Sequence, residues 1–169
     1  MKKAHVPRSA FISNGKKKSS LAKKPSHMIE LRLRIASNTE ELMHVRKFVS
    51  EAAKQFGFGD DDINNIALAV DEACTNIIKH AYNYAEDQDI NVVVTMNKTE
   101  FQVQIVDHGK HFDPERVQMP EMKEYLSHYK RGGLGMYLMK KLVDKVEYSI
   151  QPKQNVVRLT KYLHHGVSR

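Results

Sequence analysis

The sequence predicts a single α/β domain, a two-layer sandwich in which a mixed sheet carries helices on one face. Two observations favour this fold. Segments with apolar residues at every second position are interspersed with segments whose apolar residues recur at every third or fourth position. Their order is strand, helix, helix, two strands, helix, two strands, which is too irregular for a doubly wound parallel sheet. With 169 residues, 41% of them hydrophobic, the chain can bury one core.

The first strand and helix follow from a change of pattern at Met28. From there apolar and charged residues alternate strictly as far as Ile35, which predicts a half-buried strand. A helix is expected next, because Ser37 or Asn38 can cap its start and acidic residues occupy its first turn. Its inward positions recur at helical spacing and are Leu42, Val45, Phe48, Val49 and Ala52.

Glycines at positions 57 and 59 end this helix, and the acidic residues 60–62 open a second one. We expect the second helix to run to about Tyr82, with Ile63, Ile66, Val70, Ala73 and Ile77 facing inward. Later elements have similar local signals. They are strands over 90–96 and 101–106 joined by the turn 97–100, a loop over 107–131, a helix ending at Leu142, and strands over 145–150 and 156–163.

The net charge of +7 comes from one end of the chain. Residues 1–25 hold 8 of the 27 Lys and Arg residues and no acid, so 19 basic residues face all 20 acidic ones in the remainder. The basic pI therefore does not argue for nucleic-acid binding by the domain. Residues 1–27 cannot bury enough apolar surface to fold, so we expect a disordered basic tail, then a domain over 28–163 and a short tail over 164–169.

Cysteine usage and hydropathy bear on the compartment. The single cysteine, Cys74, cannot form an internal disulfide. No apolar run approaches the roughly 18 residues that a membrane-spanning helix needs. We therefore expect a cytoplasmic protein without a membrane segment.

The first motif that suggests chemistry lies in the second helix. Glu72 and Asn76 are four residues apart, so they share a helical face, and His80 continues the row. A carboxylate and an amide oxygen in this arrangement suit Mg²⁺, which prefers oxygen ligands and usually retains water and phosphate. Such residues on an outer helix face are solvated in most proteins, so the motif alone does not define a site. For His80 we favour a structural role.

The second motif lies where a hydrophobic strand ends, at Asp107, with Gly109 two residues later. A carboxylate at a strand end is held rigidly and can accept a hydrogen bond from an exocyclic amine, while the glycine lets the backbone approach a flat ring. An ordinary Asp-x-Gly turn explains the same residues equally well.

The third motif is glycine-rich. Gly132, Gly133 and Gly135 stand at the start of the third helix, directly after Arg131. Unobstructed amides at a helix N-terminus bind phosphate, and an arginine adds a charged donor. Glycines there also serve simply to pack a helix start against a neighbour. The segment is not a Walker motif, because no Gly-Lys-Ser/Thr follows.

Taken together, the E-x-x-x-N helix, the D-x-G strand end and the G-G-x-G helix start resemble the ATP site of the gyrase, histidine-kinase and MutL-type (GHKL) ATPases. Their order and spacing match that superfamily, whose fold is the Bergerat α/β sandwich. The stretches EACTNIIKHAY and RGGLGMYLMKKLVD are similar to its anti-sigma-factor serine kinases. The resemblance covers residues 28–163.

By position, the resemblance implies that Glu72 is the general base, that Asn76 is the Mg²⁺ ligand and that Asp107 binds the adenine amine. ATP and Mg²⁺ are the implied cofactors, and residues 114–130 would form a lid over the nucleotide. Phosphoryl transfer needs positioning, charge neutralisation and a proton acceptor, which these groups provide. The other implied nucleotide contacts are Gly109 at the adenine pocket and Arg131, Gly132, Gly133 and Gly135 at the phosphates.

Members of the resembling family bind a sigma factor and use ATP to phosphorylate a serine on an anti-anti-sigma protein of the STAS type. The resemblance therefore implies a serine/threonine kinase that regulates transcription through protein partners, usually as a homodimer. One departure concerns the D-x-G box, where a second glycine is frequent two residues after Gly109. This chain has His111 there, preceded by Lys110, which is expected to alter the rim of the adenine pocket.

The same motifs occur in proteins with other functions. A sensor histidine kinase needs an upstream dimerisation helix, which residues 1–27 cannot supply, and a gyrase or MutL-type machine needs a transducer domain for which the chain is too short. A nucleotide-binding protein that sequesters its partner without transferring phosphate stays open. The lysines of the tail also allow salt-sensitive nucleic-acid binding, although Phe11 is the tail's only aromatic residue for stacking.

Overall fold

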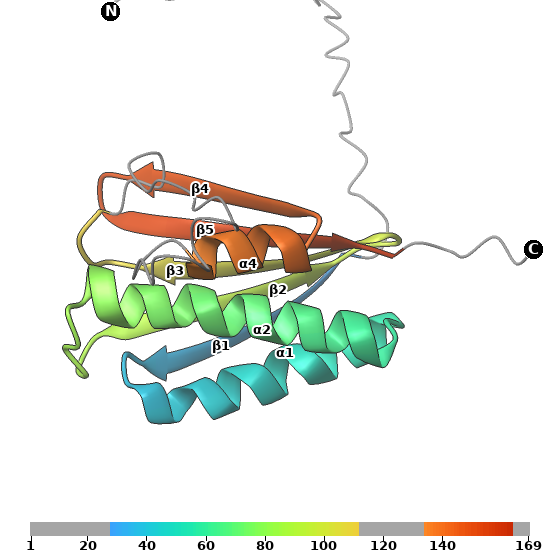
Figure 1. Cartoon of the computed structure of the whole chain (residues 1–169), viewed down its shortest axis with the longest axis horizontal. Helices are drawn as coiled ribbons and strands as arrows, with labels where there is room; N and C mark the ends of the chain where they lie inside the picture. Colours follow the sequence, from blue (N-terminus) through green and yellow to red (C-terminus); the bar gives the residue numbers. More distant parts are fainter. Residues whose placement is uncertain (1–27, 112–133, 164–169) are drawn as a thin grey trace, which may run out of the picture.

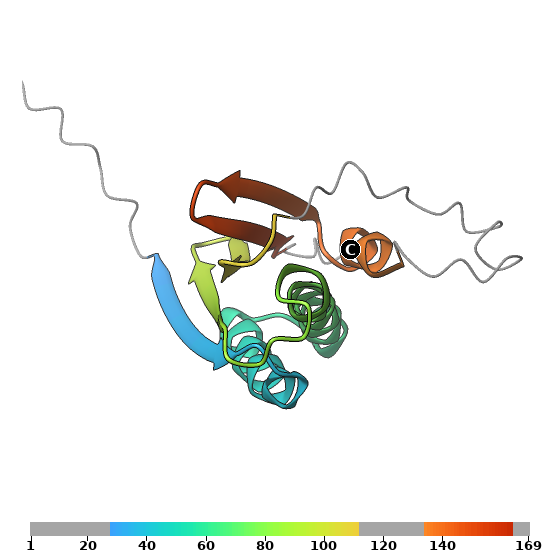
Figure 2. The ribbon, with the colours of Figure 1, turned by 90° about the vertical axis from the view of Figure 1, so that its left-hand side faces the viewer.

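The computed structural model describes residues 28–111 and 134–163 and has two layers, a twisted five-stranded sheet and helices that cover one of its faces (Figures 1 and 2). This confirms the predicted α/β sandwich with helices on one face. The elements are β1 (Ile29–Ala36), η1 (Thr39–Glu41), α1 (Leu42–Phe56), α2 (Asp60–Asn76), η2 (Ile77–Ala81), β2 (Asp89–Met96), β3 (Glu100–Asp107), α4 (Leu134–Leu142), β4 (Lys145–Gln151) and β5 (Gln154–Tyr162).

The strands are arranged in the order β1-β2-β3-β5-β4, and each of the four pairings in the described part of the chain is antiparallel. The prediction of a mixed sheet is therefore wrong there. The reason is the connection from β1 to β2. It consists of two helices, α1 and α2, which pack side by side and return the chain to the end of the sheet at which β1 finishes (Figure 1). Ala36 at the end of β1 thus pairs with Asp89 at the start of β2.

Local signals set the helix boundaries as predicted. The side chain of Asn38 accepts a hydrogen bond from the backbone N–H of Glu41 at 3.1 Å and caps the short helix η1 that leads into α1. Ser37 is buried and does not cap; its hydroxyl donates to the carbonyl of Ala85 and accepts from the N–H of Gln88. Gly57, with φ of 107°, ends α1.

The predicted second helix is divided. Its α-helical part ends at Asn76, and Ile77–Ala81 form a π-helical turn closed by a 3.0 Å hydrogen bond from the N–H of Tyr82 to the carbonyl of Ile77. The turn is followed by Asn83 and Tyr84, both at positive φ. Turns of this kind inside helices are frequent at functional sites. The π-helical turn begins directly after Asn76, the last residue of the E-x-x-x-N motif.

The core lies between the sheet and the helices. In β2 and β3 every second side chain is buried, as the alternating pattern predicts. Helix α1 contributes Val45, Val49 and Ala52, while Leu42 and Phe48 are partly buried. Helix α2 and η2 contribute the predicted stripe, in which Ile63 is partly buried and Ile66, Val70, Ala73 and Ile77 are buried. No helix within the described ranges is long and apolar enough to span a membrane.

Candidate nucleotide site

Helix α2 directs Glu72 and Asn76 toward the start of α4. Both side chains are half-buried. A β-carbon built on Gly135 would lie 2.6 Å from Oε2 of Glu72 and 3.5 Å from Nδ2 of Asn76. Carbon does not approach oxygen at 2.6 Å without displacement, so the absence of a side chain at position 135 leaves the space that the Glu72 carboxylate occupies. The structure thus brings together the predicted carboxylate and amide pair and one of the predicted glycines.

Asp107 ends β3 with its side chain 2% exposed. Its Oδ1 accepts two hydrogen bonds, one from the backbone N–H of Gly109 at 2.9 Å and one from Nδ2 of Asn155 at 2.8 Å. Asn155 lies directly opposite Asp107 in the register of β3 and β5. Within the described residues the second carboxylate oxygen, Oδ2, accepts no hydrogen bond. It is available to a donor in the adjoining pocket.

The backbone at Gly109 packs against the π-helical turn. A β-carbon there would lie 2.6 Å from the carbonyl oxygen of Ala81 and 2.8 Å from its β-carbon. The next residue, Lys110, donates its N–H to the same carbonyl oxygen at 2.9 Å. Glycine at 109 is therefore required for the contact with η2, a role that the D-x-G pattern did not reveal.

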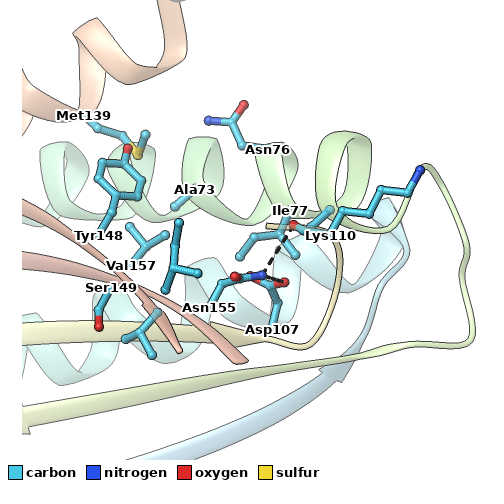
Figure 3. A pocket seen from close by; sticks show the side chains of 13 residues that line it. Ala73, Asn76, Ile77, Asp107, Lys110, Met139, Tyr148, Ser149, Asn155 and Val157 are labelled. Carbon is cyan, nitrogen blue, oxygen red and sulfur yellow. Dashed lines mark hydrogen bonds between the residues drawn. The ribbon is translucent and has the colours of Figure 1, made fainter. Parts of the chain in front are cut away.

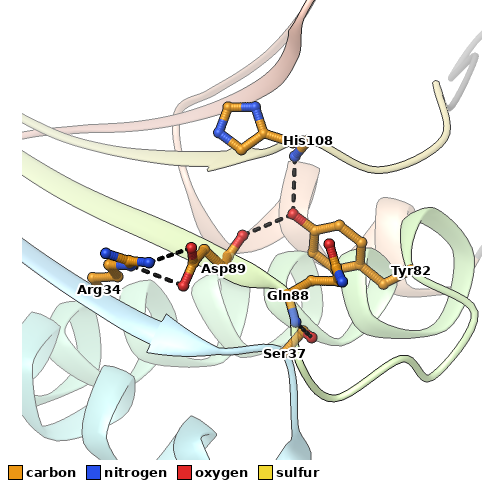
Figure 4. Close-up of polar contacts among 6 residues, drawn as sticks. All are labelled: Arg34, Ser37, Tyr82, Gln88, Asp89 and His108. Carbon is orange, nitrogen blue, oxygen red and sulfur yellow. Dashed lines mark hydrogen bonds and ion pairs between the residues drawn. The ribbon is translucent and has the colours of Figure 1, made fainter.

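Tyr82 also holds this loop, through the backbone of His108 (Figure 4). Its hydroxyl accepts a hydrogen bond from the N–H of His108 at 2.9 Å and donates to the carbonyl of Asp89 at 2.7 Å. The pKa of Tyr82 is raised, mainly by burial, so the hydroxyl keeps its proton. Asp89 also forms an ion pair with Arg34 of β1, which holds the pKa of its carboxyl below the ordinary value. Three consecutive amides after Asp107 thus have fixed acceptors.

A pocket lies between α2, α4 and the ends of β3, β4 and β5 (Figure 3). Asn76 and Asp107 both line it, whereas Glu72 lies one helical turn earlier, against Gly135, and is not part of the lining. Burial raises the pKa of Tyr148, which lines one wall, to about 12. The lining is mainly apolar, as expected of a pocket for a flat base, and consists of Ala73, Asn76, Ile77, Ala81, Asp107, Lys110, Met139, Tyr148, Ser149, Ile150, Asn155, Val156 and Val157.

Not every predicted site residue can be placed. Arg131, Gly132, Gly133 and the segment 114–130 fall outside the residues that the structure describes. His80 lies in η2, is exposed and is not among the residues that line the pocket. In the described ranges no group of three or more His, Cys, Asp or Glu side chains could hold a metal ion. Glu72 and Asn76 fit a cation that takes most of its ligands from phosphate and water, as Mg²⁺ does.

Two residues of the site were missed by sequence reasoning. Asn155 is the polar partner of Asp107, and Tyr82 fixes the loop that follows it. The one sequence signal for Asn155 is a polar residue at the start of an apolar strand, and it points to Asp107 only once the register of β3 and β5 is known. Nothing in the sequence around Tyr82 marks its hydroxyl as a contact of residue 108.

Comparison with known proteins agrees with this geometry. Residues 35–161, which include every described residue of the site, match the family described as "Histidine kinase-like ATPase domain". The chain belongs to the histidine kinase-like ATPase family. Within that family it is 34% identical to the serine-protein kinase RsbW of Bacillus velezensis over 139 residues, which is 79% of this chain and 86% of the relative. It is 29% identical to the RsbW of Bacillus cereus strain ATCC 10987, over 79% of this chain and 85% of that protein.

Two solved structures have the same fold over most of this chain. The crystal structure of the RsbU and RsbW domains of Rv1364c from Mycobacterium tuberculosis matches 79% of this chain with a TM-score of 0.57 at 16% identity, and the match spans 32% of that longer chain. The SiaB–SiaC complex from Pseudomonas aeruginosa contains a chain matched with a TM-score of 0.54 at 12% identity, over 77% of this chain and 88% of that one. At these identities the likeness concerns the fold.

Proposed function

We propose that this chain is an ATP-dependent serine-protein kinase that binds a sigma factor and phosphorylates a serine of an anti-anti-sigma partner. The observation that carries the proposal is the position of the Glu72 carboxylate, which lies against Gly135 and one helical turn from Asn76 at the edge of the pocket that Asp107 lines. The similarity to two RsbW serine-protein kinases supports the same reaction.

The described residues account for recognition of the base. Adenine enters between the apolar walls of the pocket, and its exocyclic amine donates to Oδ2 of Asp107, which accepts no hydrogen bond from the described residues. Because Oδ1 already accepts two hydrogen bonds, the side chain of Asp107 cannot rotate freely. A base with a carbonyl in place of the amine would bring its carbonyl oxygen next to Oδ2 of Asp107, and neither of these oxygens can donate a hydrogen bond.

The chemical step uses Glu72. Its carboxylate takes the proton from the hydroxyl of the partner's serine as that oxygen bonds to the γ-phosphorus, and the bond to the β-phosphate oxygen breaks to release ADP. Asn76 is the protein ligand of Mg²⁺, which neutralises phosphate charge when bound. Arg131, Gly132 and Gly133, together with Gly135, surround the phosphates in this proposal.

The finer assignments of partners are part of the same proposal. A sigma factor and an anti-anti-sigma protein of the STAS type are the partners, the active form is a homodimer, and the reaction takes place in the cytoplasm. The domain occupies residues 28–163, with tails on either side. Nucleic acid is not a direct ligand of the domain, because the near-neutral charge of residues 26–169 gives it no electrostatic footprint.

Phosphotransfer from labelled Mg-ATP in an extract of the source cells tests the proposal. The wild type is expected to label the serine of a small partner protein, and Glu72→Gln is expected to reduce labelling by at least about a hundredfold while keeping ATP bound. Glu51→Gln is the matched control, since it neutralises an exposed glutamate on α1 and leaves the pocket untouched.

Two other results would decide against the kinase. If wild type and Glu72→Gln label the partner equally, Glu72 is not the base. If the wild type binds ATP and captures a partner but transfers no label, the chain is a nucleotide-dependent sequestering protein.

A further inference from the structure

His111 departs from the glycine that is frequent at this position, and the structure gives the imidazole a specific contact. Nδ1 of His111 lies 2.6 Å from Oδ1 of Asn155, the residue whose Nδ2 donates to Asp107. The ring is not among the residues that line the pocket. His111 therefore does not obstruct the space for a base; it contacts Asn155, which forms part of the pocket floor.

The orientation of the Asn155 amide follows from its neighbours. If the amide were reversed, its oxygen would face Oδ1 of Asp107 at 2.8 Å, two acceptors in contact. The backbone carbonyls of Gly109 and Lys110, at 3.3 and 3.5 Å from Nδ2, favour the same orientation. The amide oxygen must then point toward His111, and the ring must present a proton on Nδ1 to donate to it.

We propose that His111 is a positioning residue for nucleotide recognition, acting through Asn155 on the carboxylate of Asp107. The imidazole N–H holds the amide of Asn155 in the orientation that donates to Oδ1 of Asp107, and this leaves Oδ2 directed at the amine of adenine. The inference rests on the proposed role of Asp107 in binding the base. It assigns selectivity for adenine to a residue outside the pocket lining.

Discrimination between ATP and ITP measures this effect, because the two nucleotides differ where Asp107 would contact the base. Adenine has an amine there, and hypoxanthine has a carbonyl. His111→Phe keeps a ring of similar size and removes the donor. We expect it to weaken Mg-ATP binding about tenfold, the effect of one lost hydrogen bond, with a much smaller change for Mg-ITP, so that the preference for ATP narrows.

A conservative variant separates positioning from packing. In His111→Asn the amide nitrogen takes the place of Nδ1 and can donate to Asn155, so the preference for ATP over ITP is expected to return toward the wild-type value. His44→Phe is the matched control, because it removes from α1 an imidazole that lies 3.0 Å from Glu41 of η1 and does not line the pocket. The Tm of each variant without nucleotide shows whether it folds.

A double-mutant cycle tests the route through Asn155. In an Asn155→Ala background the amide is absent, so adding His111→Phe is expected to change ATP affinity by less than about twofold. A tenfold further loss in that background would mean that His111 acts independently of Asn155, and the inference would be wrong.

Asp107→Asn separates failure of the inference from failure of the proposed site. If this variant binds Mg-ATP like the wild type, Asp107 does not hold the base and the proposed nucleotide site is wrong. If Asp107→Asn weakens ATP binding but His111→Phe keeps the wild-type preference for ATP over ITP, the role of His111 is disproved. The same holds if His111→Phe lowers Tm and weakens both nucleotides equally, which is the result of a purely structural role.

Discussion

Oε2 of Glu72 lies 2.6 Å from the position that a β-carbon at Gly135 would take. The carboxylate on α2 and the backbone at the start of α4 are therefore matched in shape, and the carboxylate cannot stay in place if residue 135 gains a side chain.

Gly135→Ala is thus expected to displace Glu72 and to lower the rate of phosphotransfer by about a hundredfold, the usual effect of moving a reacting group by about 1 Å. The KM for ATP is expected to change less than kcat. Gly59→Ala is the control, because a β-carbon there meets nothing within 4 Å. Steady-state kinetics of the two variants check the prediction, and equal kcat values would show that the carboxylate has another place to go.

Tyr82→Phe is expected to lower the free energy of unfolding by about 1–2 kcal/mol, since it removes the acceptor of the His108 N–H and a donor to Asp89. The loop after Asp107 loses one of its fixed contacts, so ATP binding weakens as well. Urea denaturation and nucleotide titration measure the two effects. Tyr84→Phe, which alters a tyrosine that is 61% exposed, should match the wild type in both.

Arg46 of α1 donates to Oδ2 of Asp71 on α2, with Nε at 2.8 Å, while the carboxylate of Asp71 is 10% exposed. Arg46→Met leaves that carboxylate without its charged partner and is expected to cost about 1–2 kcal/mol of stability, a figure reduced because Arg46 is largely in water. Adding Asp71→Asn removes the unpaired charge, so the double variant should be more stable than Arg46→Met alone. Thermal unfolding of the wild type, Arg46→Met and the double variant measures these differences in stability. A double variant less stable than Arg46→Met would contradict this account.

Cys74 is fully buried, and burial raises the pKa of its thiol from 9.0 to about 12. Because the folded chain holds this proton more tightly than the unfolded chain, its contribution to stability is complete below pH 9 and declines as the pH rises toward 12. The thiol is expected to resist alkylation by iodoacetamide at pH 8 in the folded protein and to react once urea unfolds it. Rapid labelling without urea would place Cys74 in an exposed or opening segment.

Local pattern was enough to place most elements of the fold. Alternation along β2 and β3 and the three-to-four spacing in α1 and α2 depend on neighbours in sequence. β2 and β3 lie within one residue of their predicted limits, α1 ends before Gly57 and α2 begins at Asp60 as predicted, whereas α2 ends at Asn76 and not near Tyr82. The π-helical turn at Ile77–Ala81 was missed, because its sequence continues the helical pattern and only the contacts of Ala81 with Gly109 and Lys110 distinguish it.

The residues of the candidate site show the same limit of local pattern. Glu72, Asn76 and Asp107 are marked by short motifs; Asn76 and Asp107 line one pocket, and Glu72 lies one helical turn from Asn76, against Gly135. Asn155 is separated from Asp107 by 48 residues, and their contact depends on the register of β3 with β5. Strand order and the antiparallel sheet are likewise products of long-range pairing, which periodicity does not encode.

The place of β5 in the sheet has a consequence for synthesis of the chain. Among the described strands β5 comes last in sequence, yet it lies between β3 and β4 and supplies the partner of Asp107. A nascent chain from which residue 155 has not yet emerged at the ribosome contains α2 and β3. It lacks Asn155, which lines the pocket proposed for the base. If the proposed site holds nucleotide, the ligand can stabilise the fold only after translation has passed β5.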